Sequence, residues 1–172
     1  QRSRGLGDVY KRQGFGISLP VVDDGSDAWF ARIGPGGEAL WSMIIGSKGF
    51  DTIHSISEAP DGSIYVAGTF CQNYNLLCSI SIGDNTHQSN GVSDVMIIKL
   101  SAQGDVLWSK SFGSGAADNN MWNSWYSLNQ KGIVATSDGG LLMSGYGCEG
   151  WDANCMMTIA LGIQWPTTTR SS

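Results

Sequence analysis

The chain repeats itself, and this repetition constrains its fold more than any other feature. Residues 27–46 (DAWFARIGPGGEALWSMIIG) align without a gap with residues 94–113 (DVMIIKLSAQGDVLWSKSFG), 67 positions further on. Residues 56–70 align in the same way with residues 133–147, at an offset of 77. The two offsets differ because an insertion rich in Asn and Trp precedes residue 133. A chain built this way is expected to form an array of similar units.

Each aligned block is predicted to form a β-hairpin. Short or alternating apolar runs flank turns rich in Gly and Asp, which tolerate the positive φ of tight turns. Two hairpins make one unit, with strands expected over residues 53–59, 63–69, 94–100 and 106–112. A four-stranded antiparallel unit of this kind is typical of a blade of a β-propeller. The sequence therefore predicts an all-β chain that forms a partial β-propeller of two to three four-stranded antiparallel blades.

The order of these motifs resembles that of the tandem propeller repeats in secreted and cell-surface bacterial proteins of the Bacteroidota type. The resemblance implies an extracellular or cell-surface location, and neighbouring propeller blades as packing partners. It stops near residue 162, because residues 163–172 have no repeat counterpart. The positions that match the pattern are Asp94, Lys99, Leu100, Gly104, Trp108, Gly113, Asp118, Ile133, Thr136, Asp138, Gly139, Gly140 and Gly145.

The start of the chain differs from the rest. Residues 3–13 (SRGLGDVYKRQ) resemble a translated transposase adapter used in sequencing libraries. We therefore expect residues 1–13 to be an adapter-derived artefact of a metagenomic fragment, residues 14–162 to form the partial propeller, and residues 163–172 to be an unassigned tail.

Composition excludes several classes of function. The chain carries a net charge of −5, and only 15% of its residues are charged. Clustered Lys and Arg supply most of the affinity for nucleic acid, so we expect no nucleic-acid partner. No apolar run reaches the length of about 18 residues that a transmembrane helix needs, so we also expect no membrane span.

The four cysteines are spaced as two similar pairs, Cys71 with Cys78 and Cys148 with Cys155. Cys71 and Cys148 occupy the same position of the repeat, which favours two local disulfides among the three possible connectivities. Free thiols are one alternative. A zinc site is another, although the two histidines of the chain, His54 and His87, are isolated in the sequence. Disulfides would indicate an oxidising compartment.

The insertion before residue 133 is the strongest candidate for a binding site. Trp122, Trp125 and Tyr126 could stack on a sugar ring or a peptide while Asn123 forms hydrogen bonds with it. The alternative is that these aromatic rings pack over the edge of the blade as a small satellite core.

Other sequence features have both a structural and a functional interpretation. Trp41 and Trp108 each end a hairpin, and we expect them to pack between neighbouring blades. Two oxygen-rich segments, 23–27 and 83–86, are predicted loops before strands. Asp23, Asp24 and Asp27 are calcium candidates there, with a solvated loop as the alternative.

No catalytic set of residues is evident, and we expect no cofactor. The chain has no G-x-S-x-G motif for a nucleophile, and its cysteines look paired. The leading hypothesis is a non-catalytic scaffold or binding module that presents loops to a glycan or protein partner. The alternative is part of an extracellular propeller enzyme, a glycan-active hydrolase or lyase or a quinoprotein, whose catalytic residues lie in other blades.

Overall fold

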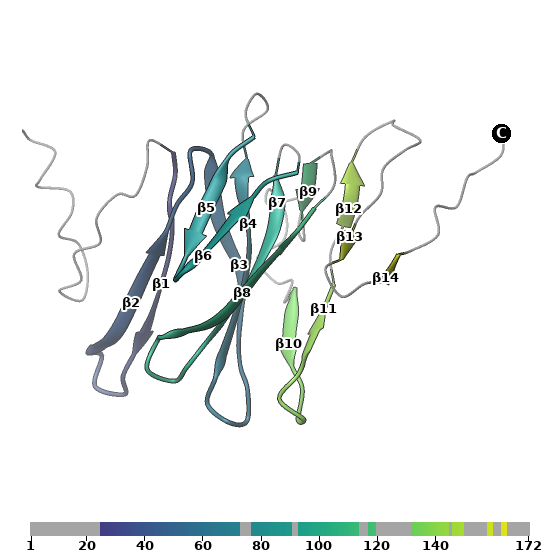
Figure 1. Ribbon diagram of the computed structural model, residues 1–172. Coiled ribbons are helices and arrows are strands. Elements are labelled where there is room, and N and C mark those ends of the chain that lie inside the picture. Colours follow the sequence, from purple (N-terminus) through teal and green to yellow (C-terminus); the bar gives the residue numbers. More distant parts are fainter. Residues whose placement is uncertain are drawn as a thin grey trace, which may run out of the picture.

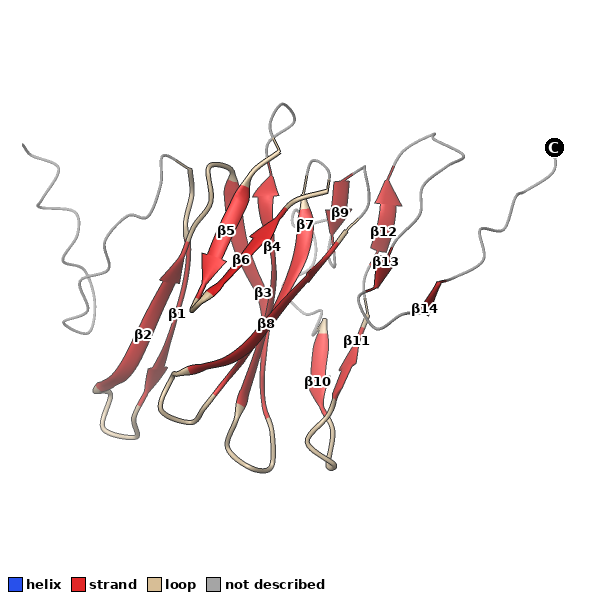
Figure 2. Ribbon diagram, viewed as in Figure 1, coloured by secondary structure: helices blue, strands red, loops and turns tan. Residues whose placement is uncertain are grey.

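The computed structural model describes residues 25–72, 77–90, 93–113, 117–119, 132–144, 146–149, 158–159 and 163–164. Every regular element among them is a β-strand, as Figure 2 shows. The prediction of an all-β, antiparallel chain is thus confirmed. The strands are β1 (Ala28–Ile33), β2 (Ala39–Ile45), β3 (Phe50–Glu58), β4 (Ile64–Gln72), β5 (Ser79–Ile82), β6 (Asn85–Gln88), β7 (Asp94–Leu100), β8 (Val106–Phe112), β9 (Ala117–Asn119), β10 (Ile133–Ala135), β11 (Leu141–Met143), β12 (Tyr146–Glu149), β13 (Thr158–Ile159) and β14 (Ile163–Gln164).

The centre of the molecule is a four-stranded antiparallel sheet with the order β3-β4-β7-β8. These strands are the four expected for one repeat unit, and β7 and β8 have the predicted bounds. The hairpin β5–β6 is inserted between β4 and β7 and pairs only with itself among the described strands. We call the sheet with this hairpin, residues 50–113, the central repeat.

The hairpin β1–β2 repeats the geometry of β7–β8 residue by residue. The pair Ala28↔Ile45 in the first hairpin corresponds to Val95↔Phe112 in the second, 67 residues on. Both hairpins carry a bulge at the same place, after Arg32 in one and after its counterpart Lys99 in the other. The sequence repeat is therefore a repeat of hydrogen-bond register.

The strands after residue 116 repeat the register of β3–β4 in two pieces. β10 and β11 pair with Ile133 opposite Met143, which matches Ile56 opposite Val66 at the 77-residue offset. β9 and β12 pair with Ala117 opposite Glu149, and this matches Phe50 opposite Gln72. The inserted residues thus fall between two strands, β9 and β10, that correspond to the single strand β3. We call residues 117–149 the third repeat.

Four hairpin turns share one geometry and lie at the same end of the molecule (Figure 1). Each turn has five residues. The amide of the first residue donates a hydrogen bond to the carbonyl of the fifth, and the amide of the fourth donates one to the carbonyl of the first. The fourth residue is always a glycine with φ between 79° and 92°, a conformation that costs other residues energy. These glycines are Gly37, Gly62, Gly104 and Gly139.

The central sheet is covered on both faces. On one face, Val66, Phe70 and Ile98 form a core with residues of β1–β2 and of β5–β6, including Phe30 and Ile80. We call this the first core. The opposite face forms the second core, which consists of Ala59, Tyr65, Ala67, Val95, Ile97, Phe112 and Ile133. Because apolar residues are buried on both faces, the central strands read as nearly continuous hydrophobic runs.

Candidate functional site

The residues predicted to bind a ligand are largely outside the described part of the chain. Trp122, Asn123, Trp125 and Tyr126 all lie there, and so do the calcium candidates Asp23 and Asp24. Of the predicted calcium ligands the structure describes Asp27 alone. No three His, Cys, Asp or Glu side chains gather to hold a metal ion within the described ranges.

The best-defined surface feature is the hairpin β5–β6, which a disulfide joins to the central sheet. Cys71, near the end of β4, is bonded to Cys78, just before β5, with 5.8 Å between the two Cα atoms. This confirms the first of the two predicted pairs. Cys148 lies on β12, but the second pair, Cys148–Cys155, falls outside the residues whose side chains are described.

Apolar packing and hydrogen bonds also hold the hairpin β5–β6 against the rest of the molecule. Ile80 and Ile82 point into the first core and are fully buried. Next to the disulfide, the Cys78 amide donates to Ser89 Oγ at 3.0 Å and the Ser89 amide donates to the Cys78 carbonyl at 2.8 Å. A disulfide, two apolar anchors and this pair of hydrogen bonds therefore fix the position of the hairpin.

The outer face of the hairpin is polar and uncharged. It consists of two cross-strand pairs, Ser79 opposite Gln88 and Ser81 opposite Thr86, and all four side chains are exposed. The Ser81 and Thr86 hydroxyls lie 3.3 Å apart. Hydroxyl and amide groups without charge can donate to and accept from sugar hydroxyls or a peptide backbone. This face is thus a candidate contact surface.

His87 links the hairpin to β8. Its Nε2 atom lies 2.8 Å from Ser109 Oγ, and its Nδ1 atom lies 3.2 Å from Ser111 Oγ. Burial lowers the pKa of His87, and the positive charge of Lys110 lowers it further. In the described part of the chain no carboxylate hydrogen-bonds to this imidazole, and Ser109 is buried. The arrangement therefore suits a structural contact between β6 and β8 rather than an activated nucleophile.

A buried carboxylate, Asp51, lies five residues after Gly46 in a Gly-Ser motif that recurs at residues 113–114 with Asp118. Asp51 accepts hydrogen bonds from the Ser47 amide at 2.6 Å, from Ser47 Oγ at 2.7 Å and from the Cys71 amide at 3.2 Å. Burial raises the pKa of Asp51, although the hydrogen bonds from Ser47 and Cys71 oppose the rise. Asp51 therefore holds the turn between β2 and β3 against the end of β4.

The predicted turn aspartates have structural roles as well. Asp61 Oδ1 accepts from the amide of Ser63 at 2.9 Å and from its hydroxyl at 2.6 Å. Asp138 does the same in the third repeat, with Thr136 Oγ1 and the Gly140 amide as donors. These hydrogen bonds lower the pKa of both aspartates. Each stabilises the turn in which it lies.

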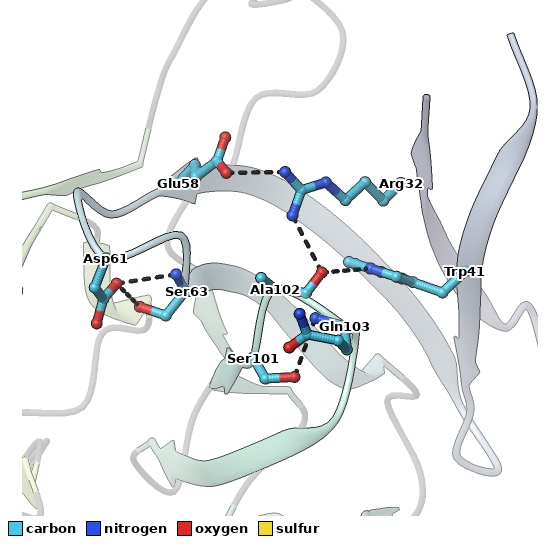
Figure 3. A network of polar contacts seen from close by, with 8 residues as sticks. All are labelled: Arg32, Trp41, Glu58, Asp61, Ser63, Ser101, Ala102 and Gln103. Atoms are coloured by element: carbon cyan, nitrogen blue, oxygen red, sulfur yellow. Dashed lines mark hydrogen bonds and ion pairs between the residues drawn. The ribbon is translucent and has the colours of Figure 1, made fainter. Parts of the chain in front are cut away.

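Polar side chains join the hairpin β1–β2 to the central repeat (Figure 3). Arg32 forms an ion pair with Glu58 at 3.1 Å and donates to the Ala102 carbonyl at 3.1 Å. The Trp41 indole donates to the same carbonyl at 3.1 Å, and its ring packs edge-on against Phe30. Trp41 therefore packs between two repeats, as predicted.

The opposite side of the central sheet has its own polar links to the third repeat. Tyr65 donates its hydroxyl hydrogen to the Gly139 carbonyl at 2.6 Å, and its ring lies beside Trp108 and under the Lys99 ammonium. The Ala135 amide donates to Ser57 Oγ at 2.9 Å. Each pair of neighbouring repeats is thus joined by apolar contacts and by a few defined hydrogen bonds.

Sequence reasoning missed the hairpin β5–β6. Residues 83–86 were expected to be a loop, but Asn85 and Thr86 belong to β6 and only Gly83 and Asp84 form the turn. The alternation of Ser and Ile over residues 79–82, followed by Gly-Asp, is a hairpin signal that could have found it.

The comparisons with known proteins add no family assignment, since no protein-family model and no curated protein matches the chain. Within the described residues there is no helix that is long and apolar enough to cross a membrane.

Proposed function

We propose that the chain is part of a secreted or cell-surface bacterial β-propeller protein and works as a non-catalytic binding module. The observation that carries the proposal is the repeated strand register, since β1–β2 matches β7–β8 and β10–β11 matches β3–β4. The hairpins β1–β2 and β10–β11 cover opposite faces of the four-stranded antiparallel sheet, an arrangement that would be expected of neighbouring blades in a propeller. A scaffold of this kind places its loops at fixed positions on a rigid support.

An extracellular location is supported by the Cys71–Cys78 disulfide. Such bonds persist in oxidising compartments and are rare in the cytosol. The disulfide ties the hairpin β5–β6 to the central sheet, so the hairpin enters a binding event with little conformational entropy left to lose.

Two surfaces are proposed to contact the partner, a glycan or a protein. One is the polar outer face of β5–β6, with Ser81 and Thr86 at its middle. The other is the insertion, with Trp122 and Trp125 as stacking residues. Aromatic rings supply apolar contact with sugar faces, whereas hydroxyl and amide groups supply directional hydrogen bonds.

The test is a glycan array probed with the full chain, produced in an oxidising compartment. Trp122→Ala with Trp125→Ala tests the insertion, and Ser81→Lys with Thr86→Lys tests the hairpin. Gln103→Ala, an exposed change in the turn between β7 and β8, is the matched control and is expected to leave binding unchanged. We expect one of the paired variants to weaken binding at least tenfold. Binding that survives both paired variants would overturn both surfaces, and turnover of a bound glycan would overturn the non-catalytic assignment.

A further inference from the structure

The outer face of β1–β2 exposes apolar residues at positions that are buried in the central repeat. Trp29 is 62% exposed and Ile33 is 40% exposed. Their counterparts 67 residues on, Met96 and Leu100, are completely buried in the first core. The same register positions are therefore covered in one repeat and open in the other.

The central repeat shows what kind of surface covers these positions. Met96 and Leu100 are packed against the inner face of the hairpin one repeat earlier, which contributes Phe30 and Trp41, and against the hairpin β5–β6. The cover on this side is thus largely the face of another repeat.

A glycine in each turn gives an independent sign of the same cover. A Cβ atom placed on Gly104 would lie 2.8 Å from Cδ2 of Trp41, because this tryptophan rests on the turn. The equivalent glycine of the first hairpin is Gly37, and a Cβ atom there would meet no described atom within 4 Å. The place that Trp41 occupies over Gly104 is therefore filled by no described residue over Gly37.

The opposite end of the array is open in a complementary way. Leu142 is 66% exposed, whereas its counterpart Tyr65 is buried in the second core. Val134 is 48% exposed, and its counterpart Ser57 contacts the next repeat through the Ala135 amide. The exposed face of β1–β2 is thus the face that a repeat packs against the repeat before it. The exposed face of β10–β11 is the face that a repeat packs against the repeat after it.

We propose that two copies of this chain associate head to tail, with the Trp29 and Ile33 face of one copy against the Val134 and Leu142 face of the next. The contact continues the stacking seen twice within the chain. Such a contact joins two different surfaces, so it closes into a ring if the rotation per copy allows this and otherwise extends as a filament. The inference rests on the proposed stacking of repeats and is independent of any glycan.

The test measures the molar mass of the full chain in solution by analytical ultracentrifugation over a hundredfold range of concentration. We expect the mass of the unmodified chain to rise with concentration. Trp29→Lys and Leu142→Lys, each alone, are expected to give monomers. Leu107→Lys is the matched control, because Leu107 is 55% exposed but lies in the central repeat.

Mixing the two variants gives the decisive result. Each retains one intact face, so an equimolar mixture of Trp29→Lys and Leu142→Lys chains is expected to form a dimer and nothing larger. A monomeric unmodified chain at every concentration would overturn the proposal. So would association that depends on Trp29 but not on Leu142, which would mean that two β1–β2 faces pair with each other.

Folding of the variants is checked separately. Near-ultraviolet circular dichroism reports the packing of Trp41 and Trp108, and Ile33→Lys provides a second variant of the first face. An unchanged spectrum with no association at any concentration would refute head-to-tail assembly and leave the repeat fold standing. Loss of the spectrum in the unmodified chain would instead count against the repeat packing on which the proposed function rests.

Discussion

The central repeat and the third repeat share one register but differ in continuity. In the central repeat, β3 runs without interruption through nine residues. At the corresponding positions the third repeat has two short strands, β9 and β10, and the residues between them number thirteen where the central repeat has three, Ile53 to Ser55. Each short strand still meets its partner at the positions that the central repeat uses.

This difference shows which signals set the register. The turn at residues 136–140 has the same hydrogen bonds and the same positive-φ glycine as the turn at 59–63, and it aligns β10 with β11 by itself. A register fixed by its turn survives an insertion further along the strand. The repeat can therefore carry a long insertion, a common place for function, without losing its pairing.

The largest expected difference between the two repeats is in the cost of losing a core residue. Phe70 is completely buried in the central repeat, so Phe70→Ala is expected to lower the free energy of unfolding by about 3–5 kcal/mol. Leu142→Ala in the third repeat removes an exposed side chain and is expected to change it by less than about 0.5 kcal/mol. Urea unfolding of dilute protein, followed by circular dichroism, measures both. Equal losses would contradict the distinction between a buried centre and open ends.

The disulfides give the next comparison. Replacing Cys71 and Cys78 by serine opens a loop of eight residues, which is expected to cost about 2.5 kcal/mol in the chain-entropy model. If Cys148 and Cys155 form the equivalent bond, their replacement is expected to cost a similar amount.

Alkylation without reductant tests the two pairs directly. If both predicted pairs are disulfides, the unreduced chain is expected to gain no mass when it is alkylated in denaturant. Two modified residues, identified by peptide mapping as Cys148 and Cys155, would confine the disulfide to the central repeat.

Removing the insertion tests whether continuity alone separates the two repeats. Deletion of residues 122–131 leaves three residues between β9 and β10, the number found in the central repeat. A shorter closed loop is expected to stabilise the chain by about 1 kcal/mol. Hydrogen exchange of the amides in β10 should also slow. Both changes would be absent if the third repeat is held by its turn alone.

A length-matched variant serves as the control for this deletion. Replacing residues 122–131 by ten Gly and Ser residues removes Trp122, Trp125 and the other proposed contact residues without shortening the loop. It is expected to abolish binding by the insertion while leaving the stability unchanged. The two variants together separate the effect of loop length from that of the aromatic residues.

The parts of the fold that the sequence predicted are those governed by local signals. The strands over 94–100 and 106–112 follow from short or alternating apolar runs, and the turns follow from glycines that adopt positive φ. Both are found where they were expected. The contacts of His87 with Ser109 and Ser111 could not be predicted, because they depend on how an inserted hairpin crosses β8. The Arg32–Glu58 ion pair likewise depends on the stacking of two repeats.

The smallest expected effect is a pH dependence confined to the central repeat, because both histidines of the chain, His54 and His87, belong to it. His54 Nε2 lies 3.0 Å from Thr69 Oγ1, and burial lowers its pKa as it lowers that of His87. The unfolded chain therefore binds protons more readily than the folded one. The stability that depends on neutral imidazoles is complete above about pH 6.5 and is lost as the pH falls through the lowered pKa values.

We expect the free energy of unfolding to be lower at pH 5.5 than at pH 7.5, and we expect His54→Gln with His87→Gln to reduce that difference. Asp51 opposes the trend, since a raised carboxylate pKa adds stability as the pH falls toward that pKa. Because Asp51 is present in both proteins, its contribution cancels when the two are compared. If the free energy of unfolding changed equally with pH in both proteins, the two histidines would not have different pKa values in the folded and unfolded chain. Amide exchange would then be expected to show no selective loosening of the central repeat in acid.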